Sequence, residues 1–237
     1  MAGKYLRGAL VQFMPTFLIP IPNVILFQYN PETMTHTWTS ATASADASRD
    51  DGNPLAVKGV PGEAFSFKLV LDASQSIADG GASGALASVS GVYTRLAALE
   101  MLQFPTGSGG GLTGSVSLSI GAQGIGFAAS VGVEPVRTVP ESQLPTVLFV
   151  WGAGRIVPVK VSSLTITETL YDTILNPIHA EVQVNLQVLT PKELAMMNGP
   201  LKELAQVAYD YTLGLRQALA VANLANSTES IIGMLPV

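Results

Sequence analysis

Apolar and polar residues alternate along several segments of this chain, which is the pattern of half-buried β-strands. The segment 65–71 has Phe and Leu on one face, and 157–161 has three valines in the same arrangement. The clearest case is 182–188, where apolar residues alternate with Gln and Asn. The continuous apolar run 147–151 predicts a strand covered on both faces, and 24–29 predicts another strand. The pattern therefore predicts a β-rich protein.

Two stretches follow a helical pattern instead. The first, 91–104, contains good helix formers and ends before Pro105. The second begins after Thr190-Pro191, an N-cap residue followed by proline at the first helical position, and is interrupted at 198–200. It resumes at Leu201 and is expected to run to about Leu224. Apolar residues recur there at spacings of three and four, which predicts an amphipathic stripe: Leu204, Val207, Ala208, Tyr211, Leu215, Leu219 and Ala222.

The remaining segments define the predicted domain organisation. Residues 40–58 are rich in Ala, Ser, Thr and Asp and predict a long loop, whereas the glycine-rich insertion 106–133 favours a projecting β-hairpin over a mobile loop. We therefore expect a β-domain over 1–190, including both segments, and a C-terminal helical extension over 191–237. The end of this extension has little periodicity, so we expect it to be ordered only as a docking tail. Its apolar residues are Ile231, Ile232, Met234 and Leu235.

The composition of the chain indicates that the domain is part of an assembly. Charged residues make up only 12% of the chain and hydrophobic residues 48%. So few charges leave much uncharged surface, which favours burial against partner subunits. A soluble β-domain rich in Ser and Thr is the alternative. The net charge of −5 and the lack of a basic cluster argue against nucleic-acid binding.

The cysteine count and the distribution of apolar runs indicate the cellular compartment of the protein. The chain has no cysteine, which excludes disulfides and cysteine-ligated metals and fits synthesis in a reducing compartment. The N-terminal segment lacks the pattern of a signal peptide. No run of 18 apolar residues is free of glycine, proline or polar interruption, so we expect no direct membrane span.

No residues form a recognisable catalytic constellation. The glycine patterns at 109–114 and 124–129 match a dinucleotide motif by letters but lack its strand–turn–helix context. His179 and Glu181 share a predicted strand face, and a metal site needs at least three ligands. We therefore expect a non-enzymatic protein without catalytic residues, cofactor or metal.

One polar stripe stands out on the predicted strand 182–188 and the residue before it. It consists of Glu181, Gln183, Asn185 and Gln187. Such a stripe suits a subunit interface or the wall of a hydrated channel, and it suits an ordinary solvent-facing surface equally well.

Five segments, taken in order, resemble one protein family. They are 27–33 (FQYNPET), 65–73 (FSFKLVLDA), 96–102 (LAALEML), 145–161 (PTVLFVWG, Arg155, PVKV) and 163–190 (SLTITE, LNPIHA, VLT). They are similar to the tube-like N-terminal domain of baseplate proteins from contractile injection systems, which are phage-tail-like particles. No single motif is specific, but five in the right order are fairly specific. The resemblance covers roughly residues 11–190.

This resemblance implies a β-rich α+β protein with a tail-tube-like β-barrel or sandwich and one flanking helix. Six copies would form a ring that joins the spike hub to the inner tube, so that the protein acts as tube initiator and spike adaptor. The implied partners are further copies of itself, the spike or hub protein, the inner tube protein and other baseplate proteins. Assembly would occur in the cytoplasm, within a particle that is free, released or membrane-anchored.

Other functions are compatible with the same residues. The chain could form another tube-fold ring of the particle, either inner tube or tube terminator. A soluble carbohydrate-binding β-sandwich is an alternative from a different class. The family commonly continues into a LysM-type domain, whereas residues 191–237 here predict a helix and tail. We therefore expect this extension to dock on a neighbouring ring or on the hub.

Overall fold

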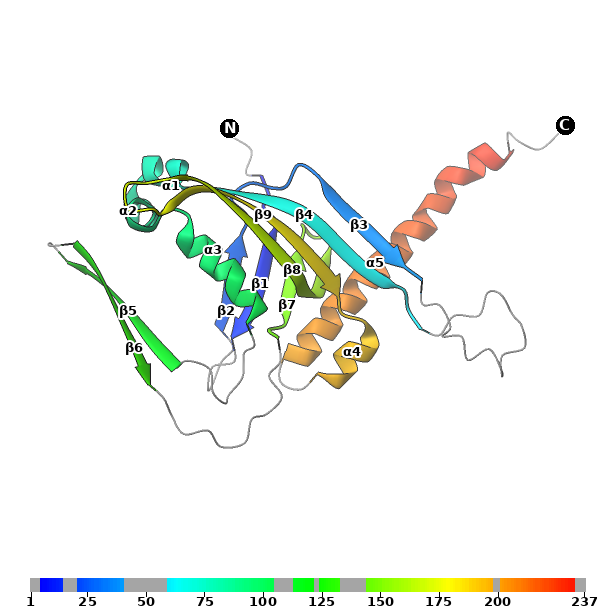
Figure 1. Cartoon of the computed structure of the whole chain (residues 1–237). Coiled ribbons are helices and arrows are strands. Elements are labelled where there is room, and N and C mark those ends of the chain that lie inside the picture. The colour runs from blue at the N-terminus through cyan, green and yellow to red at the C-terminus, as the bar shows by residue number, and fades with distance from the viewer. Residues whose placement is uncertain are drawn as a thin grey trace.

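The computed structural model describes residues 5–14, 21–40, 59–104, 113–121, 124–132, 144–197 and 201–232. Its main feature is one seven-stranded antiparallel sheet in the order β2-β1-β7-β8-β9-β4-β3 (Figure 1). The strands are β1 (Ala9–Met14), β2 (Ile21–Leu26), β3 (Met34–Thr39), β4 (Gly62–Asp72), β7 (Val147–Val150), β8 (Ile156–Tyr171) and β9 (Pro177–Val188). The strands predicted around 65–71, 147–151, 157–161 and 182–188 are confirmed. The one predicted at 24–29 begins and ends three residues earlier.

The apolar face of this sheet forms the core, and the sheet curls around it. Phe65 and Phe67 of β4 have their ring centroids 5.3 and 5.5 Å from that of Phe149 in β7. Two strands, β9 and β8, lie between β4 and β7 in the sheet. Side chains so far apart in strand order meet only because the sheet is strongly curved. The sheet is nevertheless open, since among the described strands β2 pairs only with β1 and β3 only with β4.

Three helices and a 3₁₀ turn connect β4 to the next part of the chain. They are α1 (Ala73–Asp79), α2 (Gly81–Ser90), α3 (Tyr93–Glu100) and η1 (Met101–Gln103). Helix α3 and η1 confirm the prediction at 91–104, and they contribute Leu96, Leu99 and Leu102 to the core. Gly91 precedes α3 with φ 56°, and a Cβ there would lie 2.1 Å from the carbonyl oxygen of Pro177. The chain therefore requires glycine at this close approach.

The glycine-rich insertion contains a separate two-stranded sheet. Strands β5 (Thr113–Gly121) and β6 (Gly124–Gly132) pair antiparallel with each other, which confirms the predicted hairpin. Figure 1 shows the hairpin apart from the large sheet. The predicted loop at 40–58 lies outside the described residues from position 41 onward.

The C-terminal extension consists of α4 (Pro191–Met196) and α5 (Leu201–Ile232). Thr190 caps α4 as predicted, and it forms a capping box with Glu193. Helix α5 continues to Ile232 rather than ending near Leu224, which corrects the predicted boundary. The reason is that 225–232 contains neither glycine nor proline. Ile231 and Ile232 form the last turn of α5, while Met234 and Leu235 lie outside the described residues.

Candidate functional site

The predicted polar stripe lies in the middle of the sheet, on the face opposite the core. Glu181, Gln183, Asn185 and Gln187 alternate along β9 with residues that are fully buried. Strand β9 lies between β8 and β4, so the stripe has polar neighbours on both sides. Gln183 donates a hydrogen bond to Ser66 Oγ over 2.9 Å, and Asn185 donates one to Ser163 Oγ over 2.8 Å. The structure thus brings the stripe together with side chains from the two neighbouring strands, β4 and β8.

Hydroxyl groups dominate the rest of this face. The strand registers place threonines and serines from β3, β4 and β8 beside the stripe: Thr35, Thr37, Ser66, Ser163, Thr165, Thr167 and Thr169. We call this surface, with the stripe, the polar face. Its hydroxyl and amide groups bind water readily and offer no apolar patch.

Two pairs of opposite charges lie on or near the polar face. Lys68 Nζ lies 2.8 Å from Glu181 Oε2, and His179 Nδ1 lies 3.5 Å from Asp72 Oδ2. The hydrogen bond and the positive charge of Lys68 lower the pKa of Glu181. Burial raises the pKa of Asp72, but hydrogen bonds from Ser74 and the contact with His179 outweigh burial and leave that pKa below its usual value. The face therefore carries little net charge.

The acidic and histidine side chains near the polar face do not gather into a metal site. Within the described residues, no group of three or more His, Cys, Asp or Glu side chains could hold a metal ion. His179, which shares the polar face with Glu181, contacts Asp72 instead of completing a metal site. The polar face therefore consists of partly exposed polar side chains with paired hydrogen bonds.

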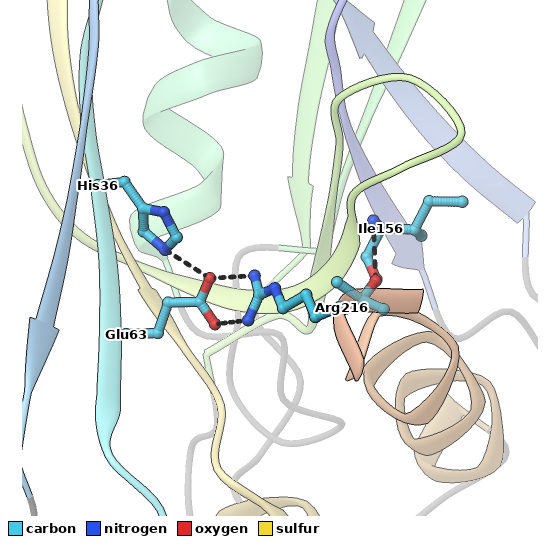
Figure 2. A network of polar contacts seen from close by, with 5 residues as sticks. His36, Glu63, Ile156 and Arg216 are labelled. Atoms are coloured by element: carbon cyan, nitrogen blue, oxygen red, sulfur yellow. Dashed lines mark hydrogen bonds and ion pairs between the residues drawn. The ribbon is translucent and has the colours of Figure 1, made fainter. Parts of the chain in front are cut away.

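A second polar cluster fixes α5 to the sheet, and sequence reasoning did not find it. Glu63 of β4 is only 5% exposed and accepts hydrogen bonds from both Nη atoms of Arg216 (Figure 2). His36 of β3 donates to the same carboxylate over 2.8 Å. The Arg216 guanidinium lies 5.0 Å from the ring centroid of Trp38. The buried carboxylate thereby has a guanidinium and an imidazole as partners at the junction of two strands and a helix.

Backbone contacts complete this anchor of α5. Thr212 Oγ1 donates to the carbonyl of Ile156 over 2.7 Å and accepts from its N–H over 3.2 Å. Tyr211 donates to the carbonyl of Ala153 over 2.9 Å. The helix approaches closely because its buried positions, Ala205 and Ala208, are small. The first half of α5 thus belongs to the domain.

The face that packs is not the predicted apolar stripe. Ala208 is the one member of that stripe that is fully buried, whereas Leu204, Val207, Tyr211 and Leu219 are exposed. The periodicity was misleading because the packed face is made of small and polar residues that satisfy specific partners. Beyond Arg216, the side chains of 217–222 are all exposed, and Figure 1 shows this part of α5 leading away from the sheet.

No protein-family model matches the chain, and no curated protein matches it. In the part of the chain that the structure describes, no helix has both the length and the hydropathy needed to cross a membrane.

Proposed function

We propose that this protein is a non-enzymatic structural subunit of a contractile injection system, in which six copies form a ring joining the spike hub to the inner tube. The observation that carries the proposal is the open, curved sheet, which has one polar, charge-paired face and two unpaired edges. The order of the five family-like segments supports the same function. The number of copies and the partners come from that resemblance.

The two free edges supply a means of ring formation. An edge strand presents unpaired N–H and C=O groups that readily pair with another strand. Strands β2 and β3 lie at opposite ends of the sheet, so the edge of one copy can pair with the other edge of the next. This contact is heterologous, and such contacts close into rings when the rotation between copies permits. The tail-tube-like barrel would then be completed by the assembly.

The polar face suits the wall of a hydrated channel. Its Thr, Ser, Gln and Asn side chains can bind water, and Lys68 compensates the charge of Glu181. A passing protein would therefore find neither an apolar patch nor a strong field on the wall. In the proposed ring, the face opposite the core would be turned toward the central channel.

The second half of α5 suits attachment to a neighbouring ring or hub. No charged residue occurs over 217–228, and Leu219 and Val221 are exposed there. A helix with little charge on any side is normally buried against a partner. The anchor at Glu63 and Arg216 holds the first half in place, so the second half projects in a defined direction.

The proposal is tested by the mass of the purified full chain, measured by light scattering alone and with hub and tube proteins. A mass of six copies, and a larger complex with both partners, is the expected result. Sixfold rings that bind tube protein but never the hub would favour an inner tube or tube terminator ring. A monomer in every mixture would overturn the proposal.

The role of α5 is tested in the same mixtures with Leu219→Glu and Val221→Glu together. The ring is expected to form normally, while binding to the hub or the neighbouring ring is lost. Gln217→Glu is the matched control because it adds charge at an exposed position before the two apolar residues. Unchanged binding by the double variant would remove this role from α5.

A further inference from the structure

The turn between β8 and β9 presents an unusual cluster of apolar side chains. Leu170, Tyr171, Ile174 and Leu175 are each at least 52% exposed. We call these four residues the apolar tip. Large apolar side chains gathered at one exposed turn indicate a contact surface.

Hydrogen bonds hold this turn in one conformation. Asp172 Oδ1 accepts from the N–H groups of Ile174 and Asn176, and Asp172 Oδ2 accepts from the Asn176 amide. The Asn176 amide also donates to the carbonyl of Val89 in α2 over 2.7 Å. The apolar tip is therefore fastened to the body of the domain, and little conformational freedom remains to be lost on binding.

Two leucines of the tip occupy strained backbone positions. Leu170 has φ 57° and Leu175 has φ 67°. This region favours glycine or asparagine, and bulky residues there are genuine outliers. Packing within the domain does not explain leucine at either position, because both side chains are largely exposed. Strain retained at a surface points to a role for the side chains themselves.

A concave surface elsewhere on the domain matches this tip. A groove of about 290 Å³ lies between β2 and α3, with Val24, Leu26 and Leu71 among its apolar lining residues. We call it the β2–α3 groove. Arg7 and Arg95 also line it, and neither forms an ion pair with another described residue. The groove therefore combines apolar lining residues with two positive charges.

The charges of the tip are opposite to those of the groove. Glu168 and Asp172 flank the apolar tip, and neither pairs with a basic side chain among the described residues. We propose that the apolar tip of one copy binds in the β2–α3 groove of the next copy. This inference rests on the proposed assembly and assigns it a second contact, made by side chains of β2 and α3 in addition to the free backbone edge of β2. The convex and concave surfaces differ, so the contact is heterologous and can propagate around a ring.

Cysteine cross-linking tests the contact directly, because the natural chain has no cysteine. Full-length Ile174→Cys and Val24→Cys variants are mixed under mild oxidation. We expect disulfide-linked pairs containing one copy of each variant. In the control, Thr37→Cys replaces Val24→Cys, because Thr37 is exposed on the polar face. We expect at least about tenfold fewer such pairs in that control. Equal yields from both mixtures would overturn the proposed contact.

Strain gives a second test in which stability and association change in opposite directions. Asparagine tolerates positive φ, so Leu170→Asn with Leu175→Asn should leave thermal stability unchanged or raised. The same variant should associate about a hundredfold more weakly, because two apolar side chains no longer become buried. Thr173→Ser, in the same turn, is the control and should change neither quantity. Undiminished association of the double variant would contradict the proposal.

A charge exchange distinguishes this contact from the proposed ring as a whole. Arg7→Glu and Glu168→Arg should each weaken association about tenfold, and combining them should restore it. If rings form but none of these variants changes them, the tip does not bind the groove and the ring proposal stands. If the unaltered protein is a monomer at every concentration, both proposals are wrong.

Discussion

The two faces of β9 differ in their packing and in their exposure to solvent. On one face Ala180, Val182 and Val184 have no exposed surface and pack among the phenylalanines of β4 and β7. On the other face Gln183 and Asn185 bind neighbouring hydroxyl groups and stay partly accessible to water. The core face determines stability, because burial of apolar area dominates folding. The polar face adds little to stability, so its composition can serve assembly.

The largest effect should come from removing an aromatic ring from the core face. Phe149→Ala leaves a cavity beside the rings of Phe65 and Phe67, which Phe149 now contacts, and we expect it to lower the free energy of unfolding by about 3–5 kcal/mol. Gln183→Ala on the polar face should change it by less than about 0.5 kcal/mol. Urea unfolding of both variants measures the difference. Similar losses would contradict the division between the two faces.

A smaller but still clear effect should come from the anchor of α5. Glu63→Gln weakens the contacts to Arg216 and His36 at a buried position, so we expect a loss of about 2–3 kcal/mol. Glu181→Gln breaks the exposed pair with Lys68 and should cause no measurable loss. Thermal unfolding followed by circular dichroism compares the two. If Glu181→Gln proved the more damaging substitution, the anchor would not hold the helix.

The smallest effect should be on the stability of the folded state at acidic pH. Burial raises the pKa of Glu193, but hydrogen bonds from Thr190 and the contact with Lys160 outweigh it, so its pKa lies below the ordinary value. A depressed carboxyl pKa stabilises the folded state above the unfolded pKa of about 4.3, and this contribution is lost as pH falls through the folded pKa. We expect Glu193→Gln to lower the free energy of unfolding at neutral pH. In this variant the free energy of unfolding should also fall less steeply below about pH 4. Urea midpoints at pH 7 and pH 3 measure this, and an unchanged decline would exclude Glu193 as a cause.

Much of the sheet could be predicted from the sequence because its central strands alternate strictly. Strands β1 and β3 were missed for a physical reason. The inward positions of β3 carry His36 and Trp38, which pack against Phe65 and Arg216 rather than forming an aliphatic pattern. Strand β1 contains Gln12, which is buried and polar. Helices α1 and α2 consist mostly of small residues without a clear apolar stripe.

The polar face could be anticipated, but the anchor of α5 could not. Alternation alone placed Glu181 to Gln187 on one face of a strand. Glu63 and Arg216 are 153 positions apart, and no local spacing links them. The apolar tip with Leu170 and Leu175 could likewise not be predicted from the sequence, because it depends on the backbone conformation of these residues.

The central claim is that the polar face lines the channel of a ring. Electron microscopy of assembled Gln183→Cys, labelled with a maleimide-gold cluster at its sole cysteine, tests it most directly. The account predicts sixfold rings with label density inside the central opening. Rings labelled on their outer surface would place the polar face outside the channel, and single unassembled particles would contradict the ring itself.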